Sequence, residues 1–158
     1  MIDYRGMIEV DAGRFTVGVF QDAAWAEKGL DALSQAGLPA DALTIIGKES
    51  PEVASLIERT FAASGDRLDI AGTGAALARG SLIAVLQGPG RDVSKLGLSG
   101  TMRRVGFQAH DARIYEALTA RGGVLVAVQS ESRVSDVLAI LLSYGGGNAA
   151  IGAWTGRV

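Results

Sequence analysis

Alternation of apolar and polar residues marks the first clear element of the chain. In FTVGVF, residues 15–20, the side chains of Phe15, Val17 and Val19 lie on one side of an extended strand, and Phe20 lies on the other. This pattern is typical of a covered strand. Residues 1–14 show weak periodicity and are predicted to be an N-terminal arm or an edge strand. Residues 15–158 are predicted to form a single domain.

Two helices and a second strand are predicted in the next part of the chain. Asp22 offers a carboxylate to the free amides of a first helical turn, and apolar residues then recur at helical spacing until Gly37. A strand follows at 43–46. Ser50, Pro51 and Glu52 supply a cap, a first-turn proline and a first-turn carboxylate, which is the order that a helix start prefers.

The middle of the chain is ambiguous. RLDIAG, residues 67–72, alternates briefly, whereas SLIAVLQ, residues 81–87, suits a buried strand or a helix equally well. We predict a strand over 82–87. Helices are predicted through Leu98 to Val105 and from Ala109 to Arg121, but the path of residues 66–107 does not follow from the pattern.

The end of the chain repeats the beginning. VLVAV at 124–128 is a strand, a helix with apolar residues on one face follows it, and a last strand is predicted around 149–154. Two β-α-β units of this kind predict an α+β fold, a ferredoxin-like sandwich with a helical, glycine-rich insertion between its halves. Its four-stranded antiparallel sheet would have both helices on one face. The alternative is an open three-layer α/β sheet with helices on both faces.

Two further expectations follow from this predicted fold. The strands at 15–20 and 124–128 should be adjacent and antiparallel in the centre of one sheet. A sheet with helices on one face leaves the other face to cover, so we also expect a symmetric homodimer unless the insertion supplies the cover.

The composition of the chain excludes several classes of function. The 158 residues are 48% hydrophobic with a formal net charge of −2, which suits one domain and gives no electrostatic footprint for nucleic acid. With no cysteine and His110 as the single histidine, thiolate and multi-histidine metal centres are excluded and no cofactor is predicted, while a carboxylate-only site for a hard cation stays open. The N-terminus has no export-signal pattern, and the most apolar stretch, 71–86, contains Arg79 and is too short to cross a bilayer. A soluble, cytoplasmic protein is expected.

Several motifs resemble a known family. VGVF at 17–20, Asp22, Gly37, DALTII at 41–46 and the stretch VGFQAHDARIYEALTARGGVLVAV at 105–128 are similar to bacterial general stress proteins of the heat-induced stress protein family (YflT type). The resemblance covers roughly residues 15–46 and 104–154. Many members carry a long Gly/Ala-rich segment between these parts, whereas here Gly72 to Gly100 is short and holds charged residues. The resemblance implies a stress-response association and no established enzymatic activity.

Few residues suggest chemistry. His110 and Asp111 begin a helix with Tyr115 about one turn further on, and the three could act as acid, base and hydrogen-bond donor. First-turn capping by His110 and Asp111 and core packing of Tyr115 are the favoured interpretation. Arg91 to Lys95, after Gly88-Pro89-Gly90, could bind an anion, but no nucleotide motif fits. Trp25 lies off the apolar stripe of its helix, which is compatible with partial exposure, as at interface anchors, and equally with packing in the core.

These observations predict a non-catalytic stress-response domain that associates with another protein, most simply a second copy of itself. One alternative is a sensor for a small anionic ligand at the glycine-rich turns, with Arg91 and Lys95 as contacts. Another is an enzyme of ferredoxin-like fold that uses His110 and Tyr115.

Overall fold

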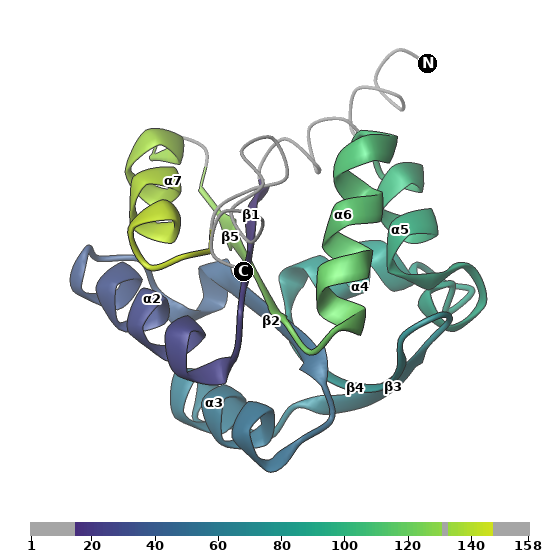
Figure 1. The fold of residues 1–158 in the computed structure, drawn as a ribbon, viewed down its shortest axis with the longest axis horizontal. Coiled ribbons are helices and arrows are strands. Elements are labelled where there is room, and N and C mark those ends of the chain that lie inside the picture. Colours follow the sequence, from purple (N-terminus) through teal and green to yellow (C-terminus); the bar gives the residue numbers. More distant parts are fainter. Residues whose placement is uncertain (1–14, 131–132, 147–158) are drawn as a thin grey trace.

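The computed structural model describes residues 15–130 and 133–146 (Figure 1). In these residues the chain is an α+β protein with an open, five-stranded antiparallel sheet and six helices, which confirms the predicted fold class. The strands are β1 (Phe15–Phe20), β2 (Leu43–Lys48), β3 (Asp66–Ile70), β4 (Gly74–Gly80) and β5 (Val124–Gln129). The helices are α2 (Ala23–Gln35), α3 (Pro51–Phe61), α4 (Ser81–Gln87), α5 (Val93–Arg104), α6 (Ala109–Ala120) and α7 (Val134–Ser143), with a short 3-10 helix, η1 (Ala40–Ala42).

The strand order is β1-β5-β2-β4-β3. β1 pairs antiparallel with β5, from Phe15 opposite Gln129 to Phe20 opposite Val124, so the predicted pairing of these strands is confirmed. β5 is in the middle of the sheet, while β1 is its last strand within the described residues. β1, α2 and β2 thus form a β-α-β unit whose two strands are not neighbours. β5 lies between them and pairs antiparallel with both. The predicted arm 1–14 and the predicted strand around 149–154 lie outside the described residues.

The insertion between the halves differs from the prediction in two ways. β3 and β4 form an antiparallel hairpin that extends the sheet beside β2, so the insertion is not only helical. The strand predicted over 82–87 is wrong, because these residues belong to α4. Leu82 and Leu86 are four residues apart on one buried face of this helix. The Thr44 hydroxyl of β2 accepts a hydrogen bond of 3.0 Å from the Leu82 amide and so caps the helix.

Helices cover both faces of the sheet, which matches the three-layer arrangement and corrects the prediction of helices on one face. The first core contains Phe15, Val17 and Val19 together with buried residues of α4, α5 and α6. The second core contains Phe20 and Val126 together with buried residues of α2, α3 and α7. Figure 1 shows α5 and α6 on the side of the sheet opposite to α2 and α7. The insertion therefore covers the face that was expected to drive a symmetric dimer.

Local interactions explain where the helices begin and how the halves are joined. Asp22 accepts from the Trp25 amide at 2.9 Å and Ser50 accepts from the Val53 amide at 3.1 Å, so both predicted caps are confirmed. The Arg133 guanidinium donates to the Ala36 carbonyl at 2.6 Å, which joins the start of α7 to the end of α2. A cation is favourable there because the carbonyls at a helix C-terminus carry partial negative charge. None of the helices in the described residues is long and apolar enough to span a membrane.

Candidate functional site

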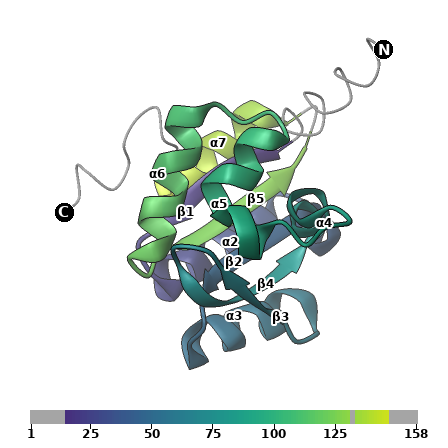
Figure 2. The same cartoon turned by 90° about the vertical axis from the view of Figure 1, so that its right-hand side faces the viewer.

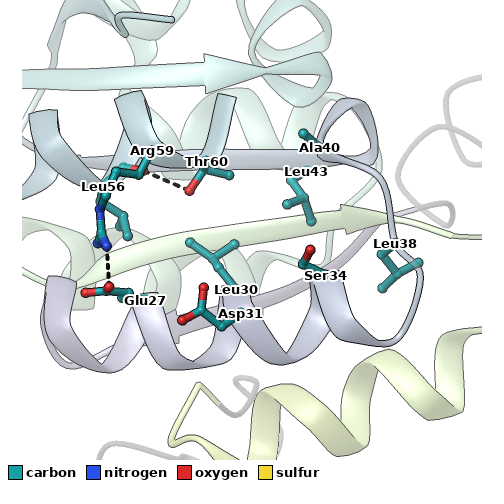
Figure 3. Close-up of a pocket in the computed structure, with 10 residues that line it drawn as sticks. All are labelled: Glu27, Leu30, Asp31, Ser34, Leu38, Ala40, Leu43, Leu56, Arg59 and Thr60. Carbon is teal, nitrogen blue, oxygen red and sulfur yellow. Dashed lines mark hydrogen bonds and ion pairs between the residues drawn. The ribbon is translucent and has the colours of Figure 1, made fainter. Parts of the chain in front are cut away.

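A groove runs between α2 and α3 on the outside of the second core (Figure 3). One part has a volume of about 140 Å³, and its floor is formed by the buried side chains of Leu30, Leu43 and Leu56. A second hollow of about 370 Å³ lies at the N-terminal ends of both helices. The two parts share Glu27, Leu56 and Arg59. Because residues from the same ends of both helices line each part, α2 and α3 run in the same direction.

An ion pair between Glu27 of α2 and Arg59 of α3 bridges the groove, and Figure 3 shows the two side chains pointing toward one another. The hydrogen bond from Arg59 holds the pKa of the Glu27 carboxyl below its usual value. The same bond raises the pKa of Arg59, and the nearby charges of Glu27 and Asp31 act in the same direction. Because the pKa of Glu27 is lowered in the folded chain, this pair stabilises the fold above the ordinary carboxyl pKa, and the effect is lost as the pH falls through the lowered value.

The surface around the groove is acidic. Asp31 and Glu52 line its two parts and have no ion-pair partner among the described residues, apart from the electrostatic effect of Asp31 on Arg59. Together, α2, α3 and their capping residues hold five acidic and two basic side chains: Asp22, Glu27, Asp31, Glu52, Glu58, Lys28 and Arg59. The pattern of the sequence does not predict this groove. Its only sequence signal is the pair Glu27 and Asp31, which are four residues apart on one helix face.

The structure does not bring the predicted pair of His110 and Tyr115 together. His110 is exposed in the first turn of α6, whereas the Tyr115 side chain is only 6% exposed and packs in the first core. An imidazole in solvent and a phenol in the core cannot converge on one substrate at the surface. No observation therefore favours the enzyme that would use these residues.

Arg91 lies in the turn before α5 and Lys95 lies in the first turn of that helix, and both side chains are exposed. The groups between them already have protein partners. The Val93 amide donates to the Gln87 side chain at 3.0 Å, and the Asp92 carboxylate pairs with Arg104. An anion at this turn would have to compete with the Gln87 oxygen and the Asp92 charge, so the geometry does not favour the anion sensor.

His110→Ala should change the free energy of unfolding by less than about 0.5 kcal/mol, because substitutions at exposed positions without a specific contact usually have small effects. Urea denaturation of both proteins measures the change. Any binding that the wild-type chain shows should be retained. A loss of more than about 1 kcal/mol, or a loss of binding, would show that His110 has a role its exposed position does not reveal.

Neither protein-family models, nor curated proteins, nor solved structures give a match for this chain. The likeness to the heat-induced stress proteins therefore rests on the motifs alone. Within residues 15–130 and 133–146, no group of three or more histidine, cysteine, aspartate or glutamate side chains could hold a metal ion.

Proposed function

We propose that this chain is a non-catalytic association domain that binds a second copy of itself, and that it acts in a stress response. The stress-response part of the proposal is supported by the family resemblance. The association part is supported by one observation, the exposed indole of Trp25 on the outside of α2.

Trp25 is 41% exposed although it belongs to a helix whose other face is fully packed. Its ring carries the Lys28 ammonium at 4.6 Å from the centroid, a cation–π contact that holds the side chain in place. Beside it lies a hollow lined by Gln21, Trp25, Ser143, Tyr144 and Gly145. Tryptophan is the residue most often found at the energetic centre of protein interfaces, because its large ring buries much apolar area at low conformational cost. An exposed indole beside a hollow is therefore suited to contact a partner.

The test is the self-association of the wild-type chain and of Trp25→Ala. We expect the wild-type mass to rise with concentration in light scattering, and we expect Trp25→Ala to weaken the association by about tenfold or more, as at other aromatic interface anchors. Val134→Ala is the matched control, because Val134 is also 41% exposed but lies at the start of α7, away from the Trp25 hollow.

Two outcomes would contradict the proposal. One is a wild-type mass that stays at the monomer value at every concentration. The other is equal association of the wild-type chain and Trp25→Ala. Circular dichroism of each variant shows whether it is folded, so that a loss of association is not confused with a loss of structure.

A further inference from the structure

The two outer helical layers of the molecule carry opposite charge. Residues 91–121, which include α5 and α6, hold six basic and three acidic side chains: Arg91, Lys95, Arg103, Arg104, Arg113, Arg121, Asp92, Asp111 and Glu116. Two of the acids have protein partners, since Asp92 pairs with Arg104 and Glu116 accepts from the Ser99 amide at 3.0 Å. The α2–α3 layer is acidic, as described above. Figure 2 shows α5 and α6 in front of the sheet and α2 behind it, so the two charged surfaces face away from each other.

The acidic surface has a receptor for a basic side chain. In the smaller part of the groove, Asp31, Ser34 and Thr60 stand around the leucine floor, together with Arg59, whose charge is paired with Glu27. The Thr60 hydroxyl donates its proton to the Leu56 carbonyl at 2.8 Å, which leaves its oxygen available as an acceptor. A carboxylate and hydroxyl oxygens suit the N–H groups of a guanidinium, and the leucine side chains suit its methylene stem.

The basic surface has side chains that fit this receptor. Arg103 near the end of α5 and Arg113 in α6 are exposed, and neither has an ion-pair partner within the described residues. α5 and α6 pack against each other, so both exposed arginines belong to the same helical layer. Both surfaces are present on every copy of the chain. The charge of each surface is opposite to that of the other, so each would attract the other surface and repel its own kind.

We propose that the α5–α6 surface of one copy binds the α2–α3 groove of the next, with Arg103 or Arg113 placed in the groove beside Asp31. This proposal rests on the proposed self-association and adds a second contact to it, because Trp25 lines the hollow at the end of α7 and not the groove. The two surfaces face away from each other on each copy, so one pair of copies cannot make both contacts at once. The contact is therefore head to tail, and it builds rings or open chains instead of a symmetric dimer. Association should weaken as salt is added, because salt screens exposed charges.

A charge swap tests this geometry directly. Asp31→Lys with Glu52→Lys makes the groove surface basic, and Arg103→Glu with Arg113→Glu makes the α5–α6 surface acidic. Each double variant alone should associate about tenfold or more weakly than the wild-type chain, because like charges then face each other. An equimolar mixture of the two should associate again, since each reversed surface meets a reversed surface of opposite sign. Light scattering at low salt measures all three samples.

The control changes the same number of charges elsewhere. Asp66→Lys with Asp69→Lys shifts the net charge as the groove variant does, but on the edge strand β3, and it should leave the association unchanged. Thermal melting verifies folding, and Asp31→Lys and Arg113→Glu serve as single variants if a double variant is unfolded. Self-association of the wild-type chain without any effect of the swap would overturn the head-to-tail geometry and keep the proposed function. A wild-type chain that stays monomeric at low salt would overturn both.

Discussion

Gly80→Ala is expected to destabilise the fold by about 3 kcal/mol or more, which combines the cost of overpacking with that of a strained backbone. Gly80 ends β4 with a φ of +133°, a conformation that side chains rarely adopt. An added Cβ would lie 2.4 Å from both the Leu43 carbonyl oxygen and the Thr44 Cα. Both atoms belong to the backbone of β2, a strand in the interior of the sheet, so neither can move away without disturbing the pairing of β2 with β4.

Gly74→Ala at the other end of β4 is the matched control. Gly74 also has a positive φ, +98°, but nothing lies within 4 Å of the position that a Cβ would take. This substitution should cost about 1 to 2 kcal/mol from backbone strain alone. Urea denaturation of the wild-type chain and the two variants gives the comparison, and similar losses for Gly74→Ala and Gly80→Ala would contradict the steric explanation.

Phe20→Ala is expected to lower the free energy of unfolding by about 3 to 5 kcal/mol, as for other large aromatic side chains removed from a core. The Phe20 ring is fully buried in the second core. It lies against two glycines that approach it from different elements, Gly29 in α2 and Gly146 after α7. Both positions are glycine where a Cβ would lie less than 3 Å from the ring, so the ring, α2 and the end of α7 fit together as one unit.

A second substitution tests this fit. Gly29→Ala alone should destabilise the fold by roughly 1 to 3 kcal/mol, because its Cβ would lie 2.5 Å from the Phe20 Cζ atom. In the Phe20→Ala background the obstacle is absent, and alanine is a better helix former than glycine by about 1 kcal/mol. Gly29→Ala should therefore become neutral or stabilising there. Denaturation of the four proteins of this double-mutant cycle measures the coupling, and additive effects would show that the ring and Gly29 do not interact.

The parts of the fold that could be predicted from the sequence are those with local signals. The alternation in residues 15–20 correctly places Phe15, Val17 and Val19 in one core and Phe20 in the other. The caps at Asp22 and Ser50 mark helix starts because each side chain bonds an amide three residues ahead. The α+β class and the pairing of β1 with β5 followed from the repeated strand and capped helix.

The errors arose where distant residues decide the structure. Residues 82–87 form a short apolar run that suits a strand or a helix. The contacts that accompany the helix are distant in sequence, among them the cap from the Thr44 hydroxyl, 38 residues earlier in the chain. The helices of the insertion cover the second sheet face through contacts that no local pattern encodes. An apolar stripe shows that a helix is covered on one side, but not which face of a sheet covers it.

In the candidate site, too, the sequence bears on local features, and features that depend on distant residues could not be predicted from it. The place of Trp25 off the apolar stripe of α2 left partial exposure and core packing open, and in the structure the side chain is exposed. The groove could not be predicted, because it depends on the side-by-side packing of α2 and α3 and on an ion pair between residues 32 positions apart. His110 and Tyr115 were chosen for their chemistry, but five residues along a helix place two side chains on different sides.

The position of β5 between β1 and β2 constrains the order in which the chain can acquire its structure. β2, β3 and β4 are close in sequence and pair with one another, so they can assemble while later residues are still on the ribosome. β1 is synthesised before these three strands, but its partner β5 begins only at Val124. Among the described residues, the earliest strand must therefore wait for the latest, with its apolar residues available to other chains in the meantime. Contacts between such distant segments slow folding, and this interval is when a nascent chain of this protein is most exposed to aggregation.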